Sequence, residues 1–393
     1  MVYVERQFRS LFFALLACFA TFGVCITIVG ATLPKIFADF GWSDLEAGGV
    51  LAAGAFGYFI SALVSGILIH RIGAKRVVVT GLALQALGLA FFAASRGVPA
   101  NGLLLFLIGV GQGGLEVVIN YSIVRMERGG RSRLMNLMHA AFCIGAIAGP
   151  FGVVALLSMW QAVYRLMAAV ALALGIVLAF LPFSRLEDED DGAAAHPPVA
   201  SLLRRPLLVL SFLILLIYVA TELGVSSWVG EYFVRVLGQE IPVGAAMVSV
   251  FWAGLFLGRL ALSVWYHGSR PAGLIVTLAV MCTLGLAFAI AAQTPWLAAA
   301  GFFVAGLGYS AIYPLVIVLV GAHFPGSQGV AVGLVSAGGG VGSFAGQVMM
   351  GAASQRLGLR GGFLLYIAAN VLMVGLAAAV AWRVRASEKA SGR

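Results

Sequence analysis

The chain of 393 residues is 62% hydrophobic and only 10% charged, with a formal net charge of +9 and a mean hydropathy of +1.04. Soluble domains carry about 25% charged residues, and a globular core of this size could not hide so much apolar surface from water. The composition therefore excludes a soluble enzyme, a disordered chain and a secreted disulfide scaffold. It predicts an integral membrane protein.

The cysteines and the N-terminal apolar run indicate neither redox chemistry nor secretion. Cys18, Cys25, Cys143 and Cys282 all lie inside apolar runs, so we expect neither a disulfide framework nor a metal cluster. The run at 11–34 is too long for a signal-peptide core and has no convincing cleavage site. Because many similar runs follow it, we interpret it as an uncleaved first span.

Twelve apolar runs are long enough to cross a membrane, for which a helix needs about 20 mostly apolar residues. They lie at 11–34, 47–69, 77–95, 97–124, 134–158, 163–183, 207–233, 242–264, 271–292, 296–322, 328–353 and 361–382. Residues 271–355 contain no Asp, Glu, Lys or Arg, and there the breaks at 293–295 and 323–327 carry residues typical of turns. The sequence thus predicts an all-α membrane protein with twelve transmembrane helices.

The positions of the basic residues predict the orientation of the chain. With both termini in the cytoplasm, 18 of the 24 Lys and Arg residues fall at cytoplasmic loops and termini, Arg259 among them, and 6 at outer loops, Lys35 among them. An excess of Lys and Arg is typical of cytoplasmic loops. We therefore expect a multi-pass protein with cytoplasmic N and C termini. The positive charge indicates topology, and we expect no nucleic-acid partner.

An acidic, hydrophilic segment divides the chain almost in half. Residues 184–206 contain an acidic run at 187–191, and we interpret this segment as a solvated cytoplasmic linker without chemistry of its own. The prediction is an N-terminal six-helix bundle over 1–183, the linker over 184–206, and a C-terminal six-helix bundle with a short cytoplasmic tail over 207–393.

The two halves repeat each other at an offset of 197 residues. The coinciding residues are Gly41 and Gly238, Gly57 and Gly254, His70 and His267, Gly109 and Gly306, Gly111 and Gly308, Gly145 and Gly342, and Gly149 and Gly346. One offset in several helices indicates duplication of a six-helix unit. Two parallel halves related by an axis along the membrane normal are typical of secondary transporters, with the substrate near the midplane between them.

A basic motif lies between the second and third spans. It consists of Gly66, His70, Arg71, Gly73, Lys75 and Arg76, and it resembles the signature of the major facilitator superfamily, which usually has Asp where this chain has His70. The segment from Gly145 to Pro150 resembles that family's Gly-Pro motif of span five. The resemblance implies two pseudo-symmetric six-helix bundles. It also implies a gating role for the basic motif, altered here because the acid is missing.

Four segments resemble the fucose/glucose-type sugar:proton symporters more narrowly. They run from Glu116 to Asn120 in span four, Leu137 to Gly145 in span five, Tyr218 to Trp228 in span seven and Phe251 to Arg259 in span eight. Members of this group carry an Asp in span one, whereas this chain has no carboxylate between Glu5 and Asp39. The resemblance implies proton-coupled transport of a monosaccharide, with Glu116 as the coupling residue.

Ionisable side chains at the centre of a span cost at least about 2.5–3.5 kcal/mol, so they mark candidate sites. Only Glu116 and Glu222 lie well inside predicted spans, and both are candidate proton carriers because an apolar setting favours a protonated carboxyl group. Gln112, Glu116 and Asn120 are spaced at i, i+4 and i+8 and share one helix face. This stripe predicts a substrate or proton site, with helix–helix hydrogen bonding as the alternative.

Other polar and aromatic residues inside the spans are candidate substrate contacts. With Gln112 and Asn120, they are Asn136, His139, Tyr218, Trp228, Trp252, Tyr309, Tyr313 and Gln347. Structural alternatives stand beside these roles. Glu222 can be an intrahelical anchor next to Tyr218, His139 can be a packing residue, the tyrosines can be structural amphipaths, and Trp228 can anchor at the membrane interface.

The chain has no Walker motif, no metal-ligand spacing and no nucleophile elbow. We therefore expect no enzyme activity, no nucleotide, and no resident cofactor or metal. The expected transported ion is H⁺, with Na⁺ as the alternative because Glu116 and Asn120 offer hard oxygen ligands. Close helix packing explains the glycines spaced four residues apart.

Together these features predict a secondary active transporter that works by alternating access. The candidate site contains no Arg or Lys, which favours a neutral polyhydroxylated solute, a monosaccharide, in symport with protons. The alternative is a proton-coupled exporter of drugs or other amphipathic or cationic compounds; a membrane sensor and a membrane-embedded enzyme have less support. The expected partners are a small-molecule substrate and the lipid bilayer. The expected state is a monomer, in a bacterial-type inner membrane.

Overall fold

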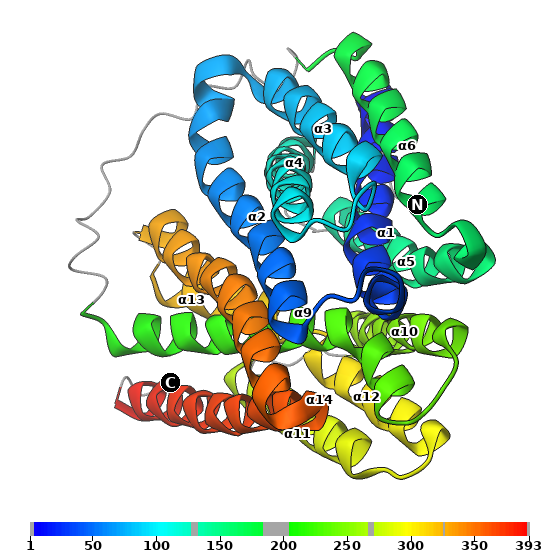
Figure 1. The fold of residues 1–393 in the computed structure, drawn as a ribbon. Helices are drawn as coiled ribbons and strands as arrows, with labels where there is room; N and C mark the ends of the chain where they lie inside the picture. Colours follow the sequence, from blue (N-terminus) through cyan, green and yellow to red (C-terminus); the bar gives the residue numbers. More distant parts are fainter. Residues whose placement is uncertain (1–3, 127–132, 184–203, 266–270, 325–326, 391–393) are drawn as a thin grey trace. The chain divides into compact units, whose positions relative to one another are not determined.

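A computed structural model describes residues 4–126, 133–183, 204–265, 271–324 and 327–390, and every regular element in these ranges is a helix (Figure 1). The chain separates into two compact units, residues 1–192 (unit 1) and 193–393 (unit 2). The division falls within the acidic segment, of which residues 184–203 lie outside the described ranges.

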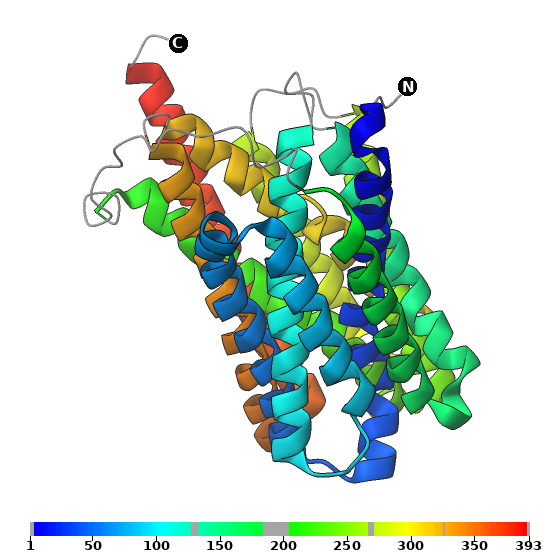
Figure 2. The same cartoon turned by 90° about the horizontal axis from the view of Figure 1, so that it is seen from above.

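Unit 1 contains the six helices predicted for the N-terminal half. They are α1 (Arg9–Phe40), α2 (Asp44–Ile72), α3 (Ala74–Phe91), α4 (Val98–Met126), α5 (Arg133–Ala155) and α6 (Gln161–Phe180), with short 3-10 turns at Arg6–Phe8 and Leu157–Met159. Helix α4 packs against both α2 and α3, and these three helices lie side by side in Figures 1 and 2. Helix α1 packs on α5, and α3 on α6.

Unit 2 contains α9 (Pro206–Arg235), α10 (Ile241–Trp265), α11 (Pro271–Ala291), α12 (Pro295–Tyr309), α13 (Ile312–His323) and α14 (Gln328–Ala390). The predicted tenth span is divided into α12 and α13. The predicted eleventh and twelfth spans are the two arms of α14, which meet at Gly358 with non-helical angles of φ 72° and ψ 167°. Within the described ranges, each of the twelve predicted spans is helical over most of its length, and 11 helices are long and apolar enough to cross a membrane, α14 containing two of the predicted spans.

The contacts inside each unit repeat the pattern seen in the sequence. The pairs α1–α5, α2–α4, α3–α4 and α3–α6 of unit 1 correspond to α9–α14, α10–α12, α11–α12 and α11–α14 of unit 2. A Cβ at Gly57 would overlap the carbonyl oxygen of Phe106, and a Cβ at Gly254 would overlap that of Phe303. Gly254 and Phe303 lie 197 residues after Gly57 and Phe106, the offset of the sequence repeat. The two units therefore use glycine at equivalent positions to bring helices together.

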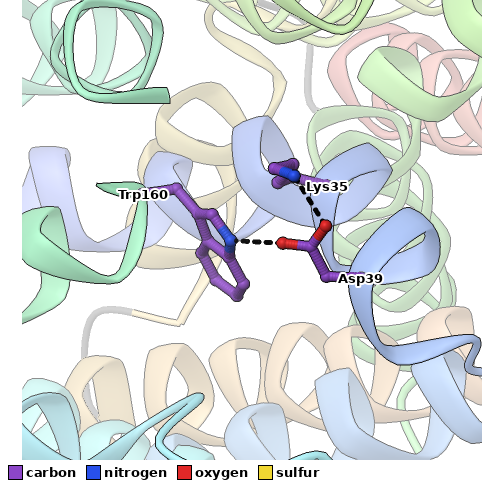
Figure 3. A network of polar contacts seen from close by, with 3 residues as sticks. All are labelled: Lys35, Asp39 and Trp160. Atoms are coloured by element: carbon purple, nitrogen blue, oxygen red, sulfur yellow. Dashed lines mark hydrogen bonds and ion pairs between the residues drawn. The ribbon is translucent and has the colours of Figure 1, made fainter. Parts of the chain in front are cut away.

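A polar network joins the end of α1 to the start of α6 (Figure 3). Helix α1 continues to Phe40, beyond the end that the sequence predicted at residue 34. Lys35, predicted in an outer loop, is helical, and its Nζ lies 2.6 Å from Oδ1 of Asp39. The indole Nε1 of Trp160 donates to Asp39 Oδ2 at 2.8 Å. The carboxylate therefore joins a cation one turn away to a donor 121 residues along the chain.

We expect Asp39→Ala to lower the unfolding temperature of the detergent-solubilised protein by about 2–4 °C, equivalent to about 1 kcal/mol. The expected loss is modest because the side chains of Lys35 and Asp39 are 26% and 30% exposed. Asp39→Asn keeps an acceptor for Trp160, so it should lose less. An unchanged unfolding temperature in Asp39→Ala would mean that the network does not stabilise unit 1.

Candidate functional site

Glu116 on α4 is the centre of the polar cluster in unit 1. The hydroxyl of Tyr58 on α2 donates to its Oε2 at 2.5 Å. The Tyr58 ring stacks on Phe22 of α1, with the ring centroids 6.4 Å apart. A carboxyl group inside an apolar bundle must be protonated or hydrogen-bonded, and Tyr58 supplies a donor that leaves the carboxyl able to take up or release a proton.

The predicted stripe on α4 contains one unsatisfied acceptor. Gln112 is buried, and Glu116 and Asn120 are half-buried. The Oδ1 atom of Asn120 is buried and makes no hydrogen bond within the part of the chain that the structure describes. Because an unsatisfied buried acceptor costs about 1–3 kcal/mol, this oxygen is suited to accept a hydrogen bond from a solute hydroxyl or a water molecule.

His139 and Asn136 on α5 differ in their surroundings. His139 is half-buried, and its ring meets that of Phe19 edge to face with the centroids 5.4 Å apart. Phe142, one turn further along α5, contacts both Phe19 and Phe22. Asn136 is exposed. Aromatic rings of α1 and α5 thus lie on the Tyr58 side of the Glu116 cluster, and His139 belongs to that aromatic group.

A second polar cluster lies in unit 2 around Glu222 of α9. Its Oε1 accepts a hydrogen bond from the Tyr218 hydroxyl, one turn earlier, at 2.7 Å. The Tyr218 ring contacts those of Tyr309 on α12 and Tyr313 on α13, at centroid distances of 5.9 and 6.3 Å. The Tyr309 hydroxyl accepts from Nδ2 of Asn370 on α14 at 2.6 Å. Four helices therefore meet at this cluster.

The remaining candidates of unit 2, Trp228, Trp252 and Gln347, all make hydrogen bonds to side chains within that unit. Gln347 of α14 accepts from Nε1 of Trp228 at 3.1 Å and donates to the Ser227 hydroxyl at 3.1 Å. Trp252 donates to Ser226 at 2.7 Å. Trp228 is fully buried, which does not fit an anchor at the membrane interface. The amide and both indoles form a hydrogen-bonded contact between α9, α10 and α14.

Arg259 lies on α10, inside the predicted eighth span rather than in a loop. Counting loop charges places it in a cytoplasmic loop, although the predicted eighth span contains it. In the structure it is half-buried on α10, and its Nε donates to the carbonyl oxygen of Ser310 at 2.9 Å. Helix α10 packs against α9, the helix that carries Glu222. Unit 2 therefore holds a half-buried basic group on a helix next to that of its buried acid.

The basic motif spans the end of α2, the turn at Gly73 and the start of α3. Gly73 ends α2 with a φ of 86° and a ψ of 150°, a conformation that favours glycine. His70 is exposed, and its ring meets Tyr121 of α4 edge to face at 6.4 Å. The Arg125 guanidinium lies over the same tyrosine ring, 4.7 Å from its centroid. Gly66 is half-buried within α2, Lys75 is half-buried, and Arg71 and Arg76 are exposed.

Sequence reasoning missed Tyr58, Arg259 and Asn370. Arg259 had a usable signal, because a charge inside a predicted span is costly. Asn370 is a lone amide in the apolar run 361–382, and it also accepts from Thr221 at 3.0 Å. Tyr58 had no signal of its own, because its role depends on a partner 58 residues away.

The family comparison covers almost the whole chain. The model of the Major Facilitator Superfamily matches residues 13–267 and 242–393. An uncharacterised MFS-type transporter of Yersinia pestis is 23% identical over 323 residues, which cover 82% of this chain and 83% of the relative.

Two further relatives have sugars in their names. The L-fucose-proton symporter of Escherichia coli is 25% identical over 289 residues, covering 65% of each chain. The glucose/galactose transporter of Brucella abortus is 32% identical over 222 residues, covering 51% of this chain and 53% of the relative.

Solved structures share the fold at low sequence identity. The nucleoside transporter NupG superposes with a TM-score of 0.79 at 16% identity, covering 96% of this chain and 99% of that one. The transporter FucP in an outward conformation gives a TM-score of 0.66 at 19% identity, covering 95% and 99%. Taken with the family match, these likenesses establish that the chain belongs to the Major Facilitator Superfamily and is a multi-pass membrane transporter, not an enzyme.

Proposed function

We propose that this protein moves a monosaccharide or similar polyhydroxylated solute by alternating access, in symport with protons. The observation that carries the proposal is the hydrogen bond from Tyr58 to Glu116, next to the unsatisfied Oδ1 of Asn120 on the same helix face. A carboxyl group that can exchange a proton and an amide oxygen that can accept from a hydroxyl are the two functions that sugar–proton symport requires.

The substrate class is supported by the two relatives whose names include fucose, glucose and galactose. Aromatic rings near Glu116, those of Phe22 and Tyr58, offer flat apolar surfaces of the kind that pack against the C–H face of a sugar. In unit 2, Arg259 donates to the Ser310 carbonyl oxygen, a bond within the protein that does not require an anionic substrate.

The proposed coupling ion is H⁺, with Glu116 as the first proton carrier and Glu222 as the second. Sodium is the alternative, because Glu116 and Asn120 offer hard oxygen ligands. We propose no resident cofactor, no nucleotide and no nucleic-acid partner, and a monomer in the lipid bilayer. The bias of 18 against 6 basic residues supports cytoplasmic N and C termini in a bacterial inner membrane.

The test is uptake of labelled L-fucose, D-glucose and D-galactose into liposomes that contain the purified protein. We expect accumulation above the external concentration when the outside is more acidic, and only equilibration without a gradient. Empty liposomes and an inward sodium gradient at equal pH are the controls. Absence of sugar flux with gradient-driven movement of a lipophilic cation would overturn the sugar proposal and favour the exporter. Accumulation driven by sodium alone would overturn proton coupling.

A further inference from the structure

The backbone of Tyr58 on α2 packs directly against two glycines of α4. A Cβ at Gly113 would overlap the carbonyl oxygen of Tyr58. A Cβ at Gly109 would overlap the carbonyl oxygen of Gly54 and lie 2.9 Å from the Tyr58 backbone nitrogen. Gly113 and Glu116 are spaced at i and i+3 and lie on the same side of α4. The two backbones therefore meet at Tyr58, one turn of α4 from the residue that accepts its hydrogen bond.

The ring of Tyr58 is held by a second contact, on α1. It stacks on Phe22, with the centroids 6.4 Å apart and the ring planes inclined at 23°. Phe22 is buried and packs edge to face on Phe142 of α5, with the centroids 5.2 Å apart. The backbone contact fixes where the Tyr58 side chain begins, and the ring contact fixes its direction. Together they aim its hydroxyl at Oε2 of Glu116, at 2.5 Å.

The repeat shows that packing of this helix pair does not require a glycine at Gly113. At the offset of 197 residues, Gly109 corresponds to Gly306 on α12, which meets the backbone of α10 in the same way. Gly113 corresponds instead to Ser310, whose side chain lies against Gly258 of α10. Unit 2 thus brings the corresponding helices together with a serine at that position.

The same offset gives Leu255 for Tyr58 and Tyr313 for Glu116. At these positions unit 2 therefore has neither the donor, nor the acid, nor the glycine of unit 1. The glycine accompanies the hydrogen-bonded pair rather than the helix contact. This difference between the two halves indicates that Gly113 serves to place the pair.

We propose that Gly113 and Phe22 are positioning residues for proton release, acting through Tyr58 on Glu116. The inference rests on the proposed proton coupling at Glu116. When this residue releases its proton, the O–H bond of the carboxyl group breaks, the proton passes to water and a carboxylate remains. The Tyr58 hydroxyl donates to that carboxylate and stabilises it, because hydrogen bonds to an ionised acceptor are the stronger kind. Gly113 and Phe22 keep the donor within reach.

The first test compares net sugar uptake with sugar exchange in liposomes that contain the full chain. Net uptake driven by a proton gradient requires Glu116 to release its proton in every cycle, whereas exchange at equal concentrations can proceed with the proton retained. Tyr58→Phe keeps the ring without the hydroxyl, so it should slow net uptake about tenfold and leave exchange unchanged. Phe22→Leu should lower the ratio of net uptake to exchange in the same direction.

Two variants at Gly113 separate positioning from packing. Gly113→Ala should lower the ratio, but it can fail to fold because the overlapping atom belongs to the backbone. Gly113→Ser with Ser61→Gly copies the pairing of Ser310 with Gly258 in unit 2, so this exchanged pair should fold and still lower the ratio. The control is Gly102→Ala on the same helix, where a Cβ meets no atom closer than 4.0 Å, and its ratio should not change.

A residue with a merely structural role would lower both rates, whether or not the Tyr58 hydroxyl is present. In the Tyr58→Phe background, adding Phe22→Leu or the exchanged pair should therefore change the ratio no further. The inference is overturned if Tyr58→Phe lowers both rates equally, if Phe22→Leu or the exchanged pair leaves the ratio unchanged, or if either effect persists without the hydroxyl.

The second test needs no sugar. The infrared carbonyl band of protonated Glu116 is identified in the purified protein as the band that Glu116→Gln lacks. Loss of a hydrogen bond moves such a band to higher frequency, so we expect this shift in Tyr58→Phe, in Phe22→Leu and in the exchanged pair. A band that stays in place in these variants overturns the inference. Absence of sugar uptake with the shifts present would overturn the proposed function alone.

Discussion

Glu116→Gln is expected to abolish gradient-driven accumulation while sugar exchange at equal concentrations continues. Glutamine has nearly the same shape, and its carbonyl oxygen can still accept from the Tyr58 hydroxyl, so the hydrogen bond of 2.5 Å between these side chains has a replacement. The amide cannot take up a proton, and the coupling step is lost. Because each pH unit corresponds to about tenfold in concentration for one proton per solute, a gradient of about two units should drive up to about 100-fold accumulation. The variant should reach about onefold.

Glu46→Gln is the matched control for this experiment. Glu46 is exposed near the start of α2, where it forms a capping box with Ser43, and glutamine also fills that position. Accumulation should therefore be retained. If the Glu116→Gln variant still accumulates sugar above the external concentration when a proton gradient is applied, Glu116 is not the proton carrier. Glu222 then becomes the candidate to test in the same assay. Loss of both accumulation and exchange would instead indicate a role in binding the solute.

Gly145→Ala is expected to have the largest effect on stability. A Cβ at this position of α5 would overlap the carbonyl oxygen of Ala20 on α1. The obstructing atom belongs to the backbone, so a rotamer change cannot make room and the two helices must move apart. Overpacking of this kind costs about 1–3 kcal/mol or more, and we expect an unfolding temperature at least about 5 °C lower, or no folded protein on size-exclusion chromatography.

Gly152→Ala tests the same substitution on the same helix. No atom lies within 4 Å of a Cβ built at Gly152, and alanine favours a helix over glycine by about 1 kcal/mol. This variant should be neutral or slightly more stable. Equal losses in both variants would show that α5 responds to any added methyl group, and the close approach to α1 would not be the cause.

The twelve spans could be located from the sequence because bilayer insertion depends mainly on local composition. Charged side chains and breaker residues mark where the apolar runs stop, and the observed helices begin and end within a few residues of most of these points. Lys35 and Arg259 are the informative exceptions. Treating each charge as a loop residue placed both outside the helices. A helix tolerates a charge where a partner is available, here Asp39 for Lys35 and the Ser310 carbonyl oxygen for Arg259.

The sequence also predicted some features of the candidate site and could not predict others. Periodicity alone placed Gln112, Glu116 and Asn120 on one face of α4, and glycines 197 residues apart indicated the repeat. The partners of these groups depend on packing between helices that are far apart in sequence. Tyr58 reaches Glu116 because Gly57 and Gly109 let α2 and α4 approach each other closely. No property of residue 58 in isolation predicts this contact.

By itself the sequence determined that the chain is a membrane protein with about twelve apolar spans, and which few polar residues those spans contain, because the cost of placing charge in lipid acts on each segment separately. Only the tertiary structure decided which of those polar residues satisfy one another. Gln347 is occupied by Trp228 and Ser227, while the Asn120 oxygen remains without a partner among the described residues. The physical reason is that hydrogen bonds need contact within about 3 Å, and contact is a property of packed helices rather than of any one segment.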